Sequence, residues 1–135
     1  MTIDRVRLAE LADALIPAGG GMPSAGEAGA AGEWLDAVLA ARPDLAVPLG
    51  GLAAATAGLG PAEAIAALPR RDPAAWAAFT TAVPAAYFMN PDVRERLGYP
   101  GQQAVPIDPD APPDYLEDGL LDSVRARPPV YRPTP

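Results

Sequence analysis

The sequence has no cysteine, no histidine and no lysine among its 135 residues. Without cysteine and histidine, the chain cannot form disulfides, Cys/His zinc sites, His-ligated haem or a Ser-His-Asp triad. Without lysine, it can neither form a Schiff base nor supply the lysine of a phosphate-binding P-loop. Little catalytic equipment is therefore present.

Large apolar side chains are also few. Aromatic residues make up 6% of the chain, and 30 of its apolar residues are alanines. Burial of an alanine contributes far less than burial of a leucine, at roughly 25 cal/mol per Å² of apolar area, so we expect a thin core. The 18 prolines and 13 glycines predict long irregular stretches. The formal net charge of -7 argues against binding to nucleic acid.

Helical periodicity and the proline positions predict an all-α fold of about five or six short helices with an extended, proline-rich C-terminal arm. Nowhere do β-branched residues alternate over five or more positions, as strands require. We place a helical domain at residues 1–100 and the arm, which is expected to dock on a partner, at residues 101–135. The arm holds eight prolines, and only residues 115–127 look capable of forming a helix there.

Cap and break signals position the first two helices. Thr2 is expected to cap a helix that Pro17 ends, because a residue before proline avoids helical geometry. Ser24 and Glu27 have the S-x-x-E spacing of a capping box. This spacing predicts a second helix that runs to about residue 41.

Similar signals position the remaining helices. Two short helices are predicted over residues 45–68, separated by the glycines of 58–60 and closed by Pro69. An Asp-Pro pair at 72–73 predicts the start of a further helix, in which Pro84 is expected to cause a kink near Thr80 or Thr81. The Asn-Pro pair at 90–91 predicts a short last helix that ends before Gly98. The apolar stripe of the 73–89 helix is expected to comprise Trp76, Phe79, Val83 and Tyr87.

Three patterns suggest a functional site, but none of them meets the requirements of the site that it resembles. Asp108 and Asp110 begin a carboxylate-rich tail, but Pro112 and Pro113 occupy the third-ligand and glycine positions of an EF-hand loop. No pair of acidic residues stands out as buried glycosidase carboxylates. The glycines at 19–21 follow a helix rather than a strand, so they predict a flexible loop and not a phosphate cradle. We predict no catalytic, cofactor-binding or metal site in this chain.

An uncharged run at residues 45–62 has the length of a membrane span. Prolines and glycines interrupt it and most of its apolar residues are alanines, so it predicts a soluble helical region without membrane insertion. Asp4 and Glu10 lie among the first ten residues, where a secretory signal has an apolar run. We therefore expect a cytoplasmic protein.

Tyrosines and arginines of the C-terminal part suggest a binding role. Tyr99, Tyr115 and Tyr131 lie in or beside the proline-rich region, and Arg132 follows the last of them. Tyrosine and arginine dominate interface hot spots, and a segment of this kind can gain order on a partner. The alternative is that the arm folds back over its own helices. Spacing alone leaves both interpretations open.

Three segments occur in an informative order: LAELADALIPAGGGMPSAGEAGAAGEWLDAVLA, DPAAWAAFTTAVPAAYFMN and PDVRERLGYPG. In this order and spacing they resemble the gluconate 2-dehydrogenase subunit 3 family. The resemblance covers about residues 8–101, with weaker echoes at 120–121 and 129–132. Its most specific pieces are ALIP at 14–17, followed by Pro23, and LGYPG at 97–101.

The resemblance implies a small helical accessory subunit of a flavin-dependent dehydrogenase that acts on sugars or polyols. The large partner of such a subunit is typically an oxidoreductase of the glucose–methanol–choline type that carries FAD, and some complexes add a cytochrome c subunit. This chain is then non-catalytic and has no cofactor of its own. The partner interface is expected to include Trp76, Phe79, Tyr99, Pro100, Tyr115, Tyr131 and Arg132.

Two expectations accompany this resemblance. Many members begin with a twin-arginine signal, whereas here nothing precedes the first family helix, so the complex is expected to stay in the cytoplasm unless the partner carries an export signal. The alternative function is a free-standing helical binding or chaperone module that is not tied to an oxidoreductase.

Overall fold

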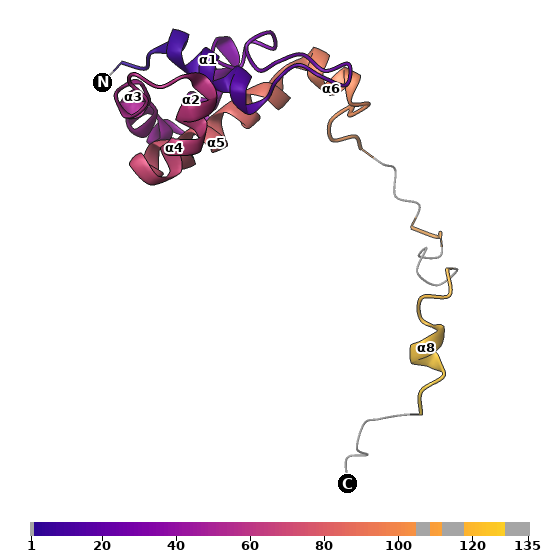
Figure 1. Ribbon diagram of the computed structural model, residues 1–135. Coiled ribbons are helices and arrows are strands. Elements are labelled where there is room, and N and C mark those ends of the chain that lie inside the picture. Colours follow the sequence, from indigo (N-terminus) through magenta and orange to yellow (C-terminus); the bar gives the residue numbers. More distant parts are fainter. Residues whose placement is uncertain (1, 105–108, 112–117, 129–135) are drawn as a thin grey trace. The chain divides into compact units, whose positions relative to one another are not determined.

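Figure 1 shows the computed structural model, which describes residues 2–104, 109–111 and 118–128. Over these residues the chain forms seven α-helices and one short 3-10 helix, and no strand. The elements are α1 (Arg5–Leu15), α2 (Glu33–Ala41), η1 (Pro43–Leu45), α3 (Ala46–Ala55), α4 (Pro61–Arg71), α5 (Pro73–Met89), α6 (Pro91–Arg96) and α8 (Asp122–Arg125). The prediction of an all-α fold is confirmed.

The chain divides into two compact units, residues 1–102 and residues 103–135. The first contains every helix from α1 to α6, and the sequence had placed its end two residues earlier. In the second unit, α8 falls inside the 115–127 range where a helix was expected, and none of its residues is buried. Residues 112–117 and 129–135 lie outside the described part of the chain.

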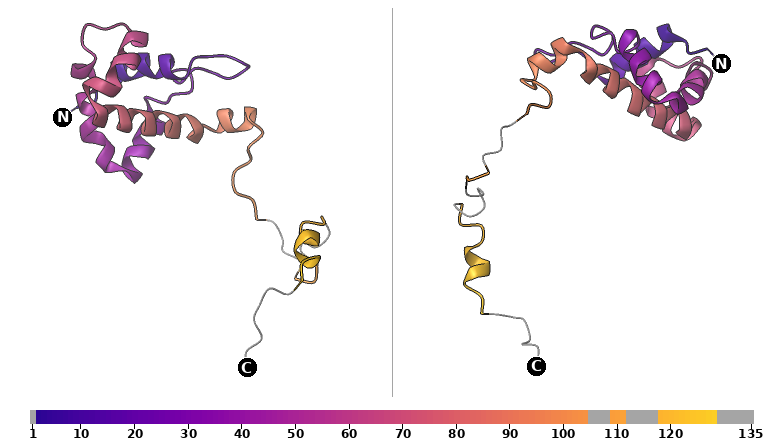
Figure 2. Two further views of the ribbon diagram at one scale, coloured as in Figure 1. Left: turned by 60° about the horizontal axis from the view of Figure 1, so that its bottom comes forward. Right: turned by 180° about the vertical axis from the view of Figure 1, so that it is seen from behind.

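Helix α5 is the central element of the first unit. It packs against α2, α3 and α4, while α1 packs on α3 and α4. Both views of Figure 2 show the other helices gathered around one part of α5, with α6 continuing from its C-terminal end. The largest fully buried side chains of the core are Leu8, Leu11, Leu35, Leu49, Leu52, Leu68, Phe79, Val83 and Val93.

Small residues on α5 explain how the helices approach it. Ala75, Ala78, Ala82 and Ala86 are buried at spacings of three and four residues, so they share one side of the helix. Nine of the 21 buried apolar residues are alanines, which is the thin core that the composition predicted. Each contributes little apolar area, so much of the core depends on a few leucines and Phe79.

One predicted helix break is wrong, because Pro69 does not end α4. Helix α4 continues past Pro69 to Arg71, where the N–H of Asp72 donates to the carbonyl of Leu68. Helix α5 continues past Pro84 to Met89. A proline removes one backbone hydrogen bond and crowds the carbonyl four residues earlier. Buried residues lie on both sides of Pro84 in α5, whereas in α4 the buried residues Ala64 and Leu68 both precede Pro69.

The start of α1 also differs from the prediction. Asp4, and not Thr2, caps this helix, because its carboxylate accepts a hydrogen bond from the N–H of Arg7 at 3.0 Å. The Arg7 side chain then reaches the turn after α3, where it donates to Thr56 Oγ1 at 3.2 Å and to the Leu59 carbonyl at 2.8 Å. This arginine therefore fixes the connection between α3 and α4 against α1.

The predicted second helix is much shorter than expected. Ser24 and Glu27 form both hydrogen bonds of the capping box, at 2.8 and 3.2 Å, but the helix they start lasts a single turn. Gly29 has φ +71° and ends it, with the N–H of Ala30 donating to the carbonyl of Ala25 at 2.9 Å. This pattern is a Schellman motif. Helix α2 therefore begins only at Glu33.

Among the residues that the structure describes, no single helix has the length and apolar character to cross a membrane. Helix α2 and the η1–α3 segment reach this length and apolar character only when taken together, and they are bent by 111° at their junction.

Candidate functional site

Local signals define α6 and the segment after it. Asn90 caps the helix, because its Oδ1 accepts from the N–H groups of Asp92 and Val93 at 2.8 and 3.4 Å. Gly98, with φ +66°, ends the helix as predicted, and the N–H of Tyr99 donates to the Arg94 carbonyl at 2.9 Å. The chain thus turns sharply at Gly98 and projects Tyr99 beside the helix that precedes it.

The loop at residues 17–32 is bound to this end of the molecule. Its tip is a tight turn in which Gly20 and Gly21 both have positive φ, as a type I′ turn requires, and residues 19 and 22 exchange two backbone hydrogen bonds. Three side chains of the α5–α6 region donate to backbone carbonyls of the loop. The bonds are Tyr87 Oη to Pro23 (2.8 Å), Asn90 Nδ2 to Ala28 (2.9 Å) and Arg96 Nη1 to Gly21 (2.8 Å).

Exposed apolar side chains are concentrated at the same end. Of the six large apolar residues that are exposed in the described part of the first unit, four lie within twelve positions of one another. These four, which we call the α6-end apolar residues, are Phe88, Met89, Leu97 and Tyr99. Leu97 is 52% exposed and Tyr99 is 55% exposed. Apolar surface that gathers in this way is typical of binding sites.

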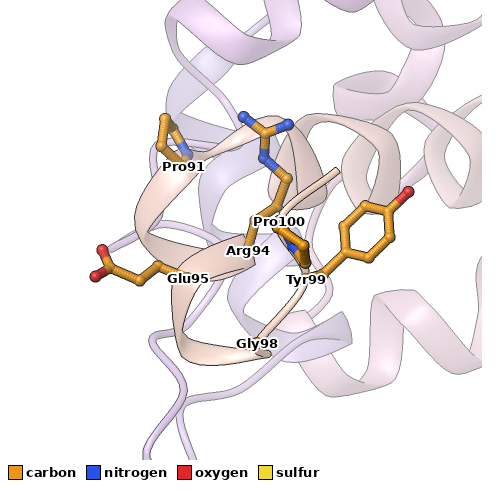
Figure 3. Close-up of a pocket in the computed structure, with 6 residues that line it drawn as sticks. All are labelled: Pro91, Arg94, Glu95, Gly98, Tyr99 and Pro100. Carbon is orange, nitrogen blue, oxygen red and sulfur yellow. The ribbon is translucent and has the colours of Figure 1, made fainter. Parts of the chain in front are cut away.

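A pocket of about 450 Å³ lies between α6 and the residues that follow it. Its lining consists of Pro91, Arg94, Glu95, Gly98, Tyr99 and Pro100, shown in Figure 3. The rings of the two prolines and the tyrosine make much of this lining apolar. In Figure 3 the Arg94 guanidinium and the Glu95 carboxylate extend in different directions and do not meet.

Arg94 is unusual in this pocket. Its Nε is buried and has no hydrogen-bond partner, and its guanidinium forms no ion pair with any residue that the structure describes. A buried donor without an acceptor typically costs about 1–3 kcal/mol. The other half-buried guanidinium of the first unit, that of Arg7, is fully engaged by Glu10, Thr56 and Leu59.

A second pocket of about 500 Å³ separates the 17–32 loop from α6 and is more polar. Glu27, Asp92 and Arg96 contribute charges to it, but Arg96 already donates to the Gly21 carbonyl and Glu27 accepts from the N–H of Ser24. Within the described ranges, no three acidic residues converge as a metal site requires. Among the described residues, this pocket therefore contains no buried polar side-chain atom that lacks a hydrogen-bond partner.

Two residues whose pKa values are shifted, Arg42 and Asp44, do not line either pocket. The guanidinium of Arg42 donates two hydrogen bonds to Asp44, at 2.8 and 2.7 Å, and lowers the pKa of this carboxyl below its usual value. The same pair raises the pKa of Arg42. Both side chains are largely exposed. The pair has the character of a surface ion pair, and nothing near it resembles a reaction centre.

The structure separates the residues that the sequence assigned to a partner interface. Phe79 is fully buried in the core and has no surface to offer, while Trp76 is half-buried against it with ring centroids 6.3 Å apart. Tyr99 and Pro100 are exposed and come together in the α6 pocket. Tyr115, Tyr131 and Arg132 lie outside the described residues.

Sequence reasoning missed Arg94 and three of the α6-end apolar residues. For Phe88 and Met89, helical periodicity was an available signal. These two residues lie outside the buried side of α5, which holds Val83, Ala86 and Tyr87. The site that results combines an apolar pocket, an unsatisfied guanidinium and exposed aromatic surface, which suits binding better than bond-making. No protein-family model, curated protein or solved structure matches this chain.

Proposed function

We propose that this chain is a non-catalytic small subunit that binds and stabilises an FAD-dependent oxidoreductase of the glucose–methanol–choline type, acting on sugars, polyols or glycosides. The proposal rests on the resemblance of residues 8–101 to the gluconate 2-dehydrogenase subunit 3 family. In this hetero-oligomer the partner carries FAD and the catalytic base, because the chain has no histidine for hydride-coupled proton transfer. The complex is cytoplasmic unless the partner brings its own export signal.

The observation that best supports this proposal is the exposure of the LGYPG segment. This segment is among the most specific parts of the resemblance, and its Leu97 and Tyr99 are about half exposed. Neither side chain is buried in the core, so packing within this chain does not explain why these two positions are apolar. Binding to another protein explains it, because tyrosine and apolar residues at the centre of an interface carry much of the binding free energy.

The thin core supports the same proposal. A partner that binds only the folded form stabilises it by mass action, by about 2.7 kcal/mol at a hundredfold excess over the dissociation constant. The same gain is a larger share of the total stability for a domain whose buried residues include nine alanines than for a domain with a leucine-rich core.

Co-expression with a flavoprotein encoded in the adjacent reading frame tests the proposal. The candidate partner is recognised by a G-x-G-x-x-G dinucleotide fingerprint. We expect a stable complex with flavin absorbance near ~450 nm, sugar-dependent dye reduction that the chain alone lacks, and a higher melting temperature for the chain in the complex than in isolation.

A matched pair of variants makes this experiment specific. Tyr99→Ala is expected to weaken the complex roughly thirtyfold, as loss of an interface anchor of about 2 kcal/mol does. Val47→Ala removes an apolar side chain of α3 that is more exposed than Tyr99, and it is expected to leave affinity unchanged. A chain that melts at the same temperature with and without the flavoprotein contradicts the proposal.

The alternative function is a free-standing binding or chaperone module. The concentration of Phe88, Met89, Leu97 and Tyr99 favours it equally, because exposed apolar surface can also receive unfolded clients. An aggregation assay with a heat-denatured test protein separates the two. Suppression of aggregation by the chain alone, lost in Tyr99→Ala, together with no affinity for the flavoprotein, favours the chaperone.

A further inference from the structure

The α6 pocket holds a positive charge that the described part of the chain does not neutralise. Of the seven arginines in the first unit, five bond to a carboxylate or a carbonyl: Arg5, Arg7, Arg42, Arg71 and Arg96. Arg70 has no such bond within the described residues, but it is exposed on α4, where water can serve it. Arg94 combines partial burial with the absence of any acceptor among the described residues.

The surroundings of Arg94 define what can bind there. Pro91, Tyr99 and Pro100 present apolar rings, and the only acidic residue of the lining, Glu95, extends away from the guanidinium. A guanidinium presents its N–H groups as a planar fork that matches a carboxylate, which accepts two of these bonds at once. The terminal amino groups of the Arg94 guanidinium form no hydrogen bond or ion pair within the described residues, and an incoming carboxylate supplies acceptors for them.

We propose that the pocket formed by Arg94, Tyr99 and Pro100 receives an acidic side chain, flanked by an apolar one, from the surface of a protein partner. The identity of that partner as the flavoprotein rests on the proposed function. The chemistry of the occupant does not, because it follows from an unpaired cation set among apolar rings. Arg94 is the specificity-determining residue, and Tyr99 and Pro100 line the pocket beside it.

Binding to the flavoprotein gives the first test, in the full-length complex. Arg94→Gln is expected to weaken the complex at least tenfold and to flatten its dependence on salt between about 50 and 500 mM, because a screened charge pair has been lost. Arg94→Lys keeps the charge without the fork and is expected to fall between wild type and Arg94→Gln. The matched control is Arg70→Gln, which removes the same charge from α4 and is expected to leave affinity within twofold.

A second test needs no flavoprotein. The ¹⁵N-labelled full chain is titrated with 3-phenylpropionate, which carries an apolar ring and a carboxylate, and separately with the neutral 3-phenylpropionamide. We expect a saturating shift of the Arg94 Nε–H signal and of the Tyr99 amide with the acid, and at least tenfold weaker binding of the amide. Arg94→Gln is expected to abolish the response while its amide spectrum and far-UV circular dichroism stay those of a folded chain.

The outcomes separate this inference from the proposed function. If the complex forms and Arg94→Gln behaves like Arg70→Gln, the pocket inference is wrong and the proposed function stands. If no complex forms, the proposed function fails and the titration decides: a response to the carboxylate alone supports the pocket, and equal or absent responses overturn it. If the wild-type chain sediments as a dimer that Arg94→Gln dissociates, the occupant is a second copy and the inference is likewise wrong.

Discussion

The two ends of α5 are built in different ways. In its N-terminal half, Phe79 has no exposed surface and belongs to the core cluster that also holds leucines of α1, α2, α3 and α4. At its C-terminal end, three side chains hold the 17–32 loop by its carbonyls, and Leu97 and Tyr99 are left about half exposed. Burial supplies the free energy of folding at the packed end, whereas hydrogen bonds fix geometry at the α6 end and leave apolar surface uncovered.

The largest expected effect contrasts two aromatic residues, one from each end. Phe79→Ala is expected to lower the free energy of unfolding by about 3–5 kcal/mol, because it removes a fully buried ring and leaves a cavity. Tyr99→Ala is expected to change it by less than about 0.5 kcal/mol. Urea unfolding of the full chain, followed by circular dichroism, measures both.

Domains typically have a free energy of unfolding of about 5–15 kcal/mol, so at the lower end of this range the loss in Phe79→Ala brings the chain near the limit of folding. Phe79→Leu, with an expected loss of about 1.5 kcal/mol, keeps the comparison measurable. Equal losses for Phe79→Leu and Tyr99→Ala contradict the division between a packed end and an exposed end.

The second prediction concerns the hydrogen bonds of the α6 end. Asn90→Ala removes both the cap of α6 and the bond to the Ala28 carbonyl, and is expected to cost about 2 kcal/mol. Asn90→Asp keeps the capping oxygen but cannot donate to that carbonyl, so an intermediate loss is expected. Native-state hydrogen exchange is expected to show faster exchange at residues 21–30 in both variants. An aspartate variant as stable as wild type means that the loop is held without this bond.

A smaller effect is expected from the turn that precedes α2. Gly29→Ala places a side chain at φ +71°, and its Cβ meets only Trp34 Cδ1 at an ordinary 3.5 Å, so the cost of about 1–2 kcal/mol is conformational. Gly19→Ala is the control, because Gly19 has open space and no positive φ. It is expected to be neutral or to stabilise by up to about 1 kcal/mol. Thermal melting compares the pair, and equal shifts contradict the role of Gly29 as a helix stop.

The smallest effect is expected at Asp44. Because Arg42 lowers its pKa, any stabilisation from the pair is present above the pKa of the unfolded chain and is lost as the pH falls through the folded value. Both side chains are largely exposed, so solvent screens the pair. Asp44→Asn is therefore expected to leave the melting temperature at pH 7 unchanged. A clear drop at pH 7 that disappears in acid shows that this surface pair contributes more than its exposure suggests.

Signals that act within a few residues were predicted well from the sequence. The local sequence determines where α5 and α6 start, because each start depends on a capping side chain and a proline ring, at Asp72–Pro73 and at Asn90–Pro91. It also determines where α6 ends, because that depends on the positive φ of Gly98. The capping box of Ser24 and Glu27 also forms. Its helix was overestimated because Gly29 takes a left-handed conformation five residues after Ser24.

Features that depend on distant parts of the chain were predicted poorly. Helix α4 continues past Pro69, although the local rule for proline predicted that it ends there. The burial of Phe79 and the isolation of Arg94 are decided by which side chains reach them from other helices, which spacing along one helix does not reveal. The candidate site therefore became visible only as a juxtaposition of α6 with the residues that follow it.

The bonds between the 17–32 loop and α5–α6 have a consequence for the order of events during synthesis. They join residues that lie 62, 64 and 75 positions apart. A ribosome that adds about 5–20 residues per second needs several seconds to cover that distance, whereas a helix forms in about a microsecond. The loop therefore leaves the ribosome long before its donors exist, and the apolar surface of the α6 end is among the last parts of the first unit to emerge. The partner proposed above, where it is already present in the cell, can therefore meet this surface as it emerges.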